Sequence, residues 1–177
     1  MKKALILVGD GFEDAELLYP YYRLQEEGLE VDVVGNEAGR VFTGKRGYPI
    51  KSTKAAKEMK IDEYAVMVVP GGHAPDKWRI DENFVRIVRQ AFDRDLVVAA
   101  ICHAAQLLIE AEVVKGRKMT CYVSVKTDLK NAGAYYEDRE VLVDANLVSS
   151  RQPADLPAFM RETIRVLHER KILPKAS

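Results

Sequence analysis

The 177-residue chain has no excess of charge of either sign, because 27 Lys and Arg residues balance 27 Asp and Glu residues. It therefore lacks the positive field that attracts nucleic acid or an anionic membrane surface. It also lacks any apolar run approaching the roughly 20 residues that span a bilayer, and its amino terminus has no signal-peptide pattern. We expect a cytoplasmic protein that binds neither nucleic acid nor membrane.

Cysteine and histidine are scarce, with two and three residues respectively. Two cysteines form at most one disulfide, and a reducing cytosol would keep them as thiols. Cys-x-x-Cys and His-Glu-x-x-His patterns are both missing, so we expect no bound metal and no cofactor. At least one cysteine needs another explanation. The length suits a single compact domain, predicted here over residues 1–177.

What the chain does contain is a series of short, continuous apolar runs, typical of strands buried on both faces of a parallel sheet. The clearest lie at residues 4–8, 64–69 and 96–100. A helical pattern over 13–27 ends at Gly28 and leads into a second strand at 29–34, which predicts a βαβ unit. The other predicted elements are a hairpin and a surface helix within 35–60, a helix capped by Asp81, a helix at 104–111, strands at 118–122, 141–143 and 147–149, and a helix at 153–170.

These elements predict a doubly wound α/β fold with a mainly parallel sheet sandwiched by helices. Such sheets bind ligands beyond the carboxyl ends of their strands. The loops that carry Glu13, Gly71 and Cys102 all lie at that edge, so we expect the functional site there.

Cys102 occupies the pattern of a nucleophile elbow, a sharp turn between a strand and a helix. An apolar strand precedes it, small residues flank it at Ala100 and Ala104, and a helix begins at once. The partial positive charge and free N–H groups of the helix start favour a thiolate, so we expect a lowered Cys102 pKa. The alternative is a small core residue, since free cysteine is often buried.

Nucleophilic catalysis typically needs a base within reach of the nucleophile and a third group that orients the base. His103 is the candidate base, although it reaches the thiol only if the turn has unusual geometry, and it is otherwise a surface histidine. Four acids lie in loops at the same edge, and each has an ordinary explanation as a first-turn helix acid. They are Glu13, Asp14, Glu16 and Asp76.

Two glycines and two aromatic residues complete the candidates. Gly71 and Gly72 follow a buried strand and fit an oxyanion site, because glycines let backbone N–H groups approach a substrate closely. Tyr122 follows a predicted strand that borders the cleft. Trp78 belongs to a residue type enriched in interfaces, with packing in the local core as the alternative.

Five segments, at residues 11–17, 43–47, 70–75, 100–103 and 148–156, together carry a specific resemblance. The chain resembles the PfpI family of intracellular cysteine peptidases, in the ThiJ/PfpI branch of the class I glutamine amidotransferase-like superfamily. The resemblance implies a flavodoxin-like fold, Cys102 as the nucleophile and His103 as its partner. It further implies that Glu16 hydrogen-bonds the thiol, that Glu13 is a second site carboxylate, and that the N–H groups of Gly72 and His103 form the oxyanion hole.

The resemblance also implies a homo-oligomer, a dimer or a hexamer, in which a neighbouring subunit supplies the acid that completes the Cys-His pair. The matching residue is Asp76, where the family peptidase has the longer Glu. The shorter side chain places that contact in question.

Three functions use the same thiol. The first is a cysteine hydrolase of peptides or amides, with Cys102 attacking the carbonyl carbon. The second is a glyoxalase or protein deglycase that acts on small aldehydes such as methylglyoxal or on their adducts, with Glu16 as general acid and base. The third is a redox-sensing or chaperone stress protein whose Cys102 oxidises reversibly. In each, low dielectric and a nearby thiolate should raise the pKa of Glu16.

Overall fold

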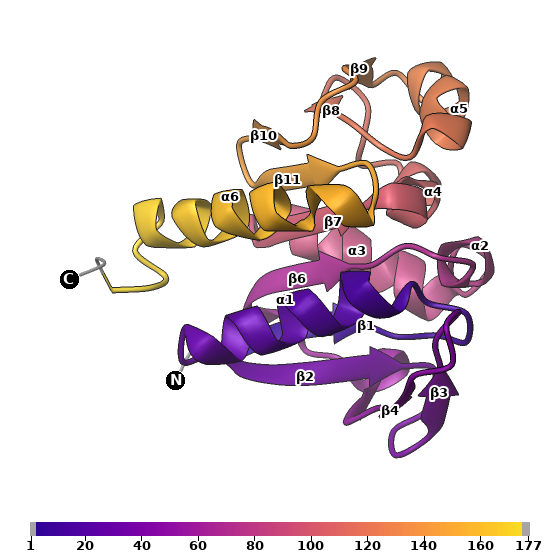
Figure 1. Cartoon of the computed structure of the whole chain (residues 1–177), viewed down its shortest axis with the longest axis vertical. Coiled ribbons are helices and arrows are strands. Elements are labelled where there is room, and N and C mark those ends of the chain that lie inside the picture. Colours follow the sequence, from indigo (N-terminus) through magenta and orange to yellow (C-terminus); the bar gives the residue numbers. More distant parts are fainter. Residues whose placement is uncertain (1–2, 175–177) are drawn as a thin grey trace.

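The computed structural model describes residues 3–174, which form a seven-stranded sheet with helices on both faces (Figure 1). The strand order is β10-β11-β7-β6-β1-β2-β5, and every neighbouring pair is parallel except β10 and β11. The strands are β1 (Lys3–Leu7), β2 (Glu30–Gly35), β5 (Lys54–Ala55), β6 (Tyr64–Val69), β7 (Val97–Ile101), β10 (Leu142–Asp144) and β11 (Leu147–Ser150).

The three apolar runs of the sequence are the three adjacent central strands β1, β6 and β7. Ile6 lies opposite Val68, which in turn lies opposite Ala99, and all three side chains are fully buried. These strands are apolar throughout, rather than alternating, because helices cover both sides of the sheet. The predicted doubly wound, mainly parallel fold is confirmed.

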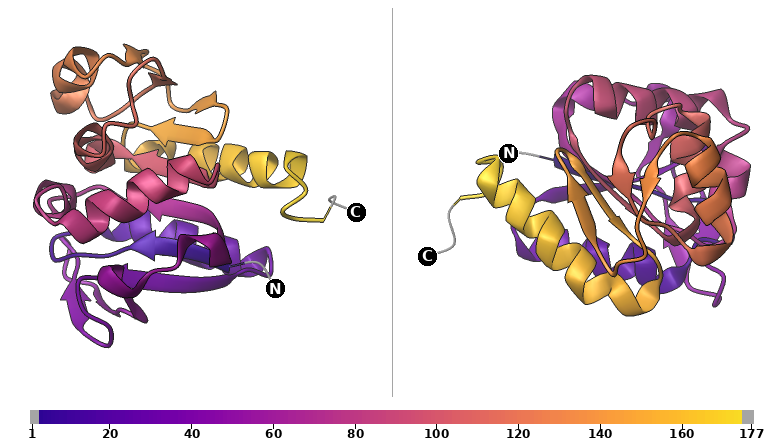
Figure 2. Two further views of the ribbon diagram at one scale, coloured as in Figure 1. Left: turned by 180° about the vertical axis from the view of Figure 1, so that it is seen from behind. Right: turned by 90° about the horizontal axis from the view of Figure 1, so that it is seen from above.

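The helices lie in two layers. Helices α1 (Asp14–Glu26) and α6 (Leu156–Glu169) cover one face, and α3 (Glu82–Asp93) covers the other (Figures 1 and 2). Asp81 caps α3 as predicted, since its Oδ1 accepts the N–H of Asn83 at 2.9 Å. Gly28, with φ +81°, ends α1.

Several local predictions need correction. The hairpin is present as β3 (Val41–Thr43) and β4 (Pro49–Lys51), but the expected surface helix is replaced by two 3₁₀ turns, η1 (Ala56–Glu58) and η2 (Ile61–Glu63). The strand predicted at 118–122 ends early, because Tyr122 turns away and donates its N–H to the Cys102 carbonyl at 3.2 Å. It is β8 (Lys118–Met119), which pairs with β9 (Tyr135–Tyr136). Helix α5 (Lys126–Asn131) was not predicted.

The direction in which the chain is wound across the sheet reverses beside β1. From β1 the chain passes through α1 to β2 on one side, whereas β6 and β7 lie on the other side. The loops after β1, β6 and β7 therefore meet at one edge of the sheet, the usual ligand-binding position in such folds. In the described part of the chain, no helix has the length and apolar character needed to cross a membrane.

Candidate active site

Cys102 lies in a strained turn at the carboxyl end of β7. Its φ is +65°, a left-handed backbone conformation that residues other than glycine seldom adopt. The 3₁₀ turn η3 (Cys102–Ala104) follows and leads directly into α4 (Ala105–Glu110). Such strain costs roughly 1–3 kcal/mol and concentrates at functional sites. The side chain is 7% exposed, so the thiol lies just below the surface.

The turn brings His103 back onto its neighbour's sulfur. His103 Nδ1 lies 3.2 Å from Cys102 Sγ, and the imidazole stacks on the Tyr122 ring with centroids 4.8 Å apart. Burial, followed by the positive charges of Lys45 and His73, lowers the His103 pKa. A neutral imidazole in contact with the thiol is the state that can accept its proton.

Ser124 holds the other side of the imidazole. Its Oγ lies 3.3 Å from His103 Nε2, in the place where an orienting carboxylate was expected. Sequence reasoning missed this residue because 21 positions separate it from His103 and it follows an irregular loop. No motif or periodicity in the sequence pointed to it.

Glu16 is a fully buried carboxyl beneath the thiol. Its Oε2 accepts the Gly71 N–H at 2.7 Å, whereas the buried Oε1 has no hydrogen-bond partner among residues 3–174. Burial raises the Glu16 pKa to about 8, despite the opposing effect of the Gly71 N–H. The predicted direction is confirmed, and a pKa of about 8 favours the protonated carboxyl at neutral pH.

The Cys102 pKa is raised, so the predicted lowering is wrong. Burial is the largest cause and the charge of Glu16 the next, and together they exceed the opposing hydrogen bonds from the His103 and Gly72 N–H groups. Those two N–H groups nevertheless meet at the sulfur. Because a proton on Glu16 removes the repulsion between the two groups, thiol and carboxyl titrate as a pair.

The two glycines have different positions. The Gly71 N–H is taken by Glu16, so it is not free to bind a substrate oxygen. The Gly72 N–H points at Cys102, and Gly72 has φ +85°. A Cβ on Gly72 would lie 2.4 Å from the Glu13 nitrogen, so only glycine fits this approach of two loops.

Glu13 and Asp14 belong to the rim of the site. Glu13 is largely buried, and its carboxylate lies 3.5 Å from Lys45 Nζ and 3.9 Å from Arg46 Nε. Asp14 accepts the N–H groups of Arg46 and Tyr48 at 2.8 and 2.9 Å, so it anchors the β3–β4 hairpin. The hairpin thus brings two cations beside Glu13, which the sequence analysis did not anticipate.

Asp76 and Trp78 lie on α2 (Ala74–Trp78), outside the cluster at Cys102. Asp76 is exposed and forms no hydrogen bond or ion pair with another described residue. Trp78 is 3% exposed and stacks on Phe84 with centroids 5.6 Å apart, so it is a core residue. Its proposed place in a subunit interface is therefore wrong. Residues 3–174 contain no group of three or more metal-ligating side chains.

The site thus consists of a strained cysteine at the edge of a seven-stranded sheet. A histidine, a buried glutamate and two backbone N–H groups surround its sulfur. The sequence model of the DJ-1/PfpI family matches residues 2–166. The chain belongs to the DJ-1/PfpI family. The predicted membership of the ThiJ/PfpI branch is confirmed, because the match covers nearly the whole chain.

Two named relatives and one solved structure are similar to this chain. Deglycase PfpI of Pyrococcus furiosus is 49% identical over 165 residues, covering 93% of this chain and 99% of that protein. Protein/nucleic acid deglycase 2 of Escherichia coli is 42% identical over 168 residues, covering 94% and 98%. The crystal structure of a two-domain Anabaena variabilis protein with dj-1/thij/pfpi-like and ferritin-like domains has a TM-score of 0.91 at 37% identity. That match covers 99% of this chain and 50% of the other. The prediction of a cysteine-dependent hydrolase, with deglycase activity among its forms, is confirmed for the family.

Proposed function

We propose that the chain is a deglycase or glyoxalase whose Cys102 attacks small 2-oxoaldehydes such as methylglyoxal, or their adducts on amino groups. The observation that carries this proposal is the fully buried Glu16 carboxyl, whose pKa burial raises to about 8, beside Cys102, which is only 7% exposed. A recessed sulfur is accessible to a three-carbon carbonyl compound more readily than to a peptide chain. The names of the two deglycase relatives support the same chemistry.

The first step is addition of the sulfur to the aldehyde. His103 Nδ1, 3.2 Å from the sulfur, accepts the thiol proton. The sulfur forms a bond to the aldehyde carbon while the carbonyl electron pair moves onto oxygen. The Gly72 and His103 N–H groups, which already point at the sulfur, stabilise that oxygen, and Glu16 supplies its proton.

The second step is an internal redox change that needs no external oxidant. The hydrogen on the former aldehyde carbon leaves as a proton, with Glu16 as the base, while the ketone oxygen takes up a proton, which gives an enediol. A proton then returns to the neighbouring carbon as the hydroxyl group on the former aldehyde carbon gives up its own. The aldehyde carbon becomes a thioester while the ketone becomes an alcohol. Water then cleaves the thioester, which releases a 2-hydroxy acid and restores the thiol.

The peptidase or amidase alternative depends on an acid that orients His103. Among the described residues, the imidazole Nε2 faces the Ser124 hydroxyl. This alternative therefore rests on Asp76 of a neighbouring subunit. The redox alternative requires reversible oxidation of Cys102 without turnover.

Parallel assays separate these activities. Purified protein is supplied with methylglyoxal, with methylglyoxal-treated N-acetyl-lysine and with fluorogenic peptides, and Cys102→Ala serves as the blank. We expect a 2-hydroxy acid from the first two substrates and little peptide cleavage. Peptide cleavage that depends on Cys102, without acid formation from methylglyoxal, would contradict the proposal.

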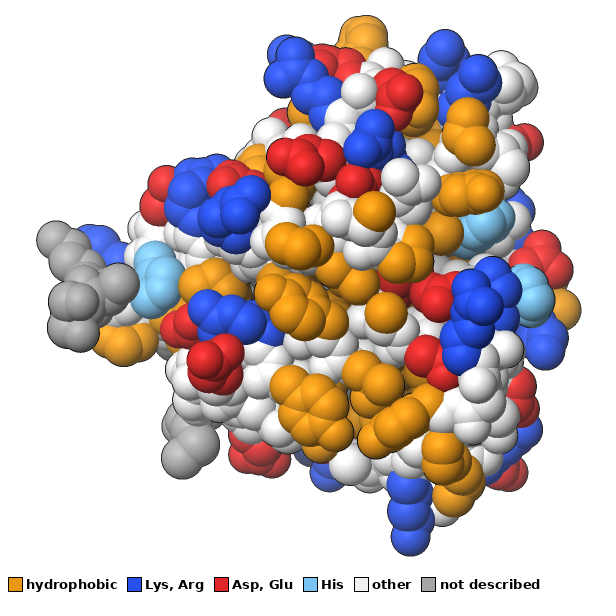
Figure 3. Space-filling view, in the orientation of Figure 1, with side chains coloured by type: hydrophobic (Ala, Val, Ile, Leu, Met, Phe, Trp, Pro, Cys, Tyr) orange, Lys and Arg blue, Asp and Glu red, His pale blue; other side chains and the backbone are white. Residues whose placement is uncertain are grey.

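We also propose that the chain assembles into a homo-oligomer, as DJ-1/PfpI proteins commonly do. Hydrophobic side chains gather on the face over α1 (Figure 3), where Tyr19 and Tyr22 are exposed, and Tyr48 of the adjacent hairpin is exposed as well. Asp76, which has no partner among residues 3–174, is free to reach His103 of another subunit. Light scattering across a dilution series tests the assembly. A monomer at every concentration would refute it.

A further inference from the structure

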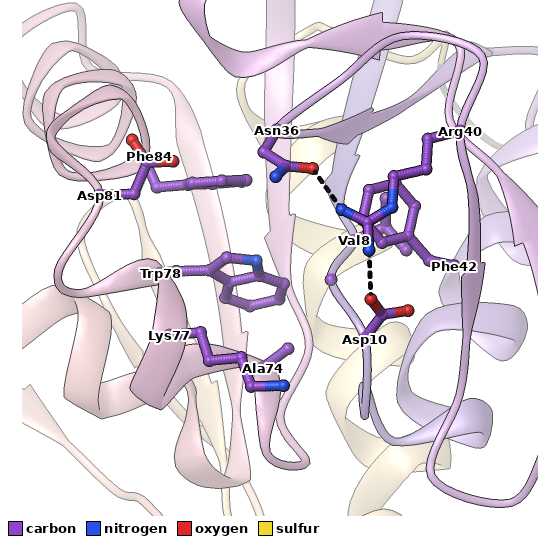
Figure 4. A pocket seen from close by; sticks show the side chains of 11 residues that line it. Val8, Asp10, Asn36, Arg40, Phe42, Ala74, Lys77, Trp78, Asp81 and Phe84 are labelled. Carbon is purple, nitrogen blue, oxygen red and sulfur yellow. Dashed lines mark hydrogen bonds and ion pairs between the residues drawn. The ribbon is translucent and has the colours of Figure 1, made fainter.

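The β3–β4 hairpin is fastened to the loop that follows β1, at the edge of the sheet where the candidate active site lies. Arg40, at the start of the hairpin, lies 2.6 Å from an oxygen of Asp10 in that loop, beside a cavity of about 230 Å³ that Trp78 also lines (Figure 4). The other Asp10 oxygen accepts the Thr43 N–H at 3.1 Å. Asp10 therefore fixes the strand that leads into the hairpin tip, residues 44–48.

The hairpin tip closes around the carboxylate of Asp14. Its two oxygens accept the N–H groups of Arg46 and Tyr48, at 2.8 and 2.9 Å. Gly44 packs on the same group so closely that a Cβ there would lie 2.6 Å from three of its atoms. Asp14 is 8% exposed, and charge-assisted bonds from backbone N–H groups to such a carboxylate are among the stronger hydrogen bonds. One side chain therefore determines where the tip lies.

Lys45 lies between two residues that contact Asp14, so its position depends on that carboxylate. The Lys45 N–H donates to the Phe12 carbonyl at 2.8 Å, and its ammonium nitrogen lies 3.5 Å from a Glu13 oxygen. Glu13 and Asp14 are consecutive residues at the start of α1. The same short segment thus holds the backbone of the tip and receives its cation.

Glu13 and Glu16 are two carboxyls that act on one another, since burial and then the charge of Glu13 raise the Glu16 pKa. Such a pair is most stable with one group ionised and the other protonated. Lys45 and Arg46 lie 3.5 and 3.9 Å from Glu13, whereas no ion pair joins Glu16 to a cation in residues 3–174. The cations of the tip therefore favour the charge on Glu13 and leave the proton on Glu16.

The Lys45 charge also acts on the groups around the thiol. It lowers the His103 pKa, second to burial, and it opposes the rise that burial causes in the Glu16 pKa. The other titratable groups that act on these two residues are His73, Glu13 and Cys102. A cation kept in this place helps His103 to remain neutral, the form that can accept the thiol proton.

We propose that Asp14 is a positioning residue of the active site, because it holds the hairpin tip so that Lys45 stays on Glu13. With that charge paired, the proton of the site stays on Glu16. The sequence position of Asp14 indicated only a first-turn helix acid. The proposal rests on the proposed function for the roles of His103 and Glu16 in turnover, whereas the clamp at Asp14 is independent of the substrate.

The pH profile of turnover tests the proposal, because activity needs a neutral His103 at the acid limb and a protonated Glu16 at the basic limb. Loss of the Lys45 charge raises both pKa values, so Lys45→Met should move both limbs to higher pH by roughly half a unit. Asp14→Asn should move them the same way, because its amide NH2 faces one of the two N–H donors and releases the tip. Loss of the Asp14 charge by itself would act in the opposite direction, and reduced stability alone would lower the rate at every pH.

Two controls accompany these variants. Lys45→Arg keeps the cation and should retain the unmodified profile. Asp144→Asn changes another carboxylate that accepts a backbone N–H, that of Lys118 at 2.8 Å, and should leave the profile unchanged. Circular dichroism checks folding, and Gly44→Ala, whose Cβ meets the Asp14 carboxylate, replaces Asp14→Asn if that variant does not fold.

Proton NMR gives a readout that needs no substrate. The chain has three histidines, and the imidazole signal that is lost in His103→Gln identifies that of His103. The His103 pKa should rise in Lys45→Met and in Asp14→Asn. If the unmodified protein forms no acid from methylglyoxal while this pKa moves, the proposed function fails and the clamp stands. An unmoved or lowered His103 pKa in Asp14→Asn, or equal shifts in Lys45→Arg and Lys45→Met, would overturn the proposal.

Discussion

The two cysteines of this chain are both buried, yet their surroundings differ in every other respect. Cys102 is 7% exposed and Cys121 1% exposed, and burial is the first cause of a raised pKa at each. At Cys121 the pKa rises to about 12, and the only further cause is the charge of Asp128. Cys102 in addition has two backbone N–H donors and the His103 imidazole. The groups that surround the sulfur, rather than its depth, therefore distinguish the proposed nucleophile from a packing residue.

The largest expected difference between the cysteines is in turnover. Cys102→Ala should lower the rate of acid formation from methylglyoxal by at least about 1000-fold, because the nucleophile is lost. Cys121→Ala removes a buried thiol that takes part in none of the contacts described around Cys102, and it should retain the rate within about twofold. Steady-state kinetics of both variants measure the difference. Comparable losses in the two would remove the distinction between the sites.

The second difference is in the pH dependence of stability. Glu16 has a pKa of about 8 in the fold, against 4.5 without it. Its contribution is fully present below about pH 4.5 and is lost as the pH rises through 8, because over this range the carboxyl ionises in the unfolded chain while the buried group keeps its proton. Between about pH 4 and pH 9, the unfolding free energy of Glu16→Gln relative to that of the unmodified protein should rise by roughly 5 kcal/mol.

Urea denaturation at several pH values measures this effect. Cys121→Ala is the matched control. Because Cys121 does not titrate between pH 4.5 and 8, the change in unfolding free energy caused by this substitution should be constant over that range. A Glu16→Gln effect that does not vary with pH would show that the carboxyl is already charged at neutral pH.

The third difference is in alkylation. Cys102 should react with limiting iodoacetamide about 100-fold faster than Cys121 at neutral pH, although its pKa is raised, because it is 7% exposed against 1% and His103 Nδ1, 3.2 Å away, can accept its proton as it reacts. Peptide mapping of the labelled protein measures both rates in one sample. Preferential labelling of Cys121 would reverse the assignment.

The fourth prediction uses the acids beside Cys102. Glu16→Gln removes a charge that raises the Cys102 pKa, so alkylation at about pH 9 should accelerate roughly tenfold, while turnover falls for lack of the acid. At about pH 6, where Glu16 is protonated, the alkylation rates should converge. Glu13→Gln should have a smaller effect, since Lys45 already balances that charge. Cys121 labelling in each sample is the internal reference, and equal effects of both substitutions would contradict the model.

The smallest expected effect concerns the orientation of His103. Ser124→Ala removes the hydroxyl at Nε2 and should lower turnover about fivefold, because a neutral hydrogen bond contributes roughly 1 kcal/mol. If the partner subunit's acid orients the ring instead, Asp76→Asn should have the larger effect, and dilution below the assembly concentration should reproduce it. Kinetics of both variants, each paired with light scattering, separate the two arrangements.

Local patterns in the sequence were sufficient for the central elements. The apolar runs at 4–8, 64–69 and 96–100 predicted the strands β1, β6 and β7, since only strands covered on both faces are apolar throughout. Small residues around Cys102 predicted its turn. The strand predicted at 118–122 was too long, because the Tyr122 N–H bonds to the Cys102 carbonyl instead of continuing the strand. This contact joins segments 20 residues apart, so no local sequence pattern contains it.

By itself, then, the sequence determined the doubly wound sheet, the Cys102 turn and the acids available to it, because periodicity, glycine and residue size act over a few neighbouring positions. Only the tertiary structure decided the electrostatics and the partners. The balance between burial and N–H donors set the direction of the Cys102 pKa, and the return of a distant loop placed Ser124 on His103. Trp78 is a core residue beside a cavity. The buried face of the short helix α2 is decided by its packing on the β1 loop, and this packing depends on long-range contacts.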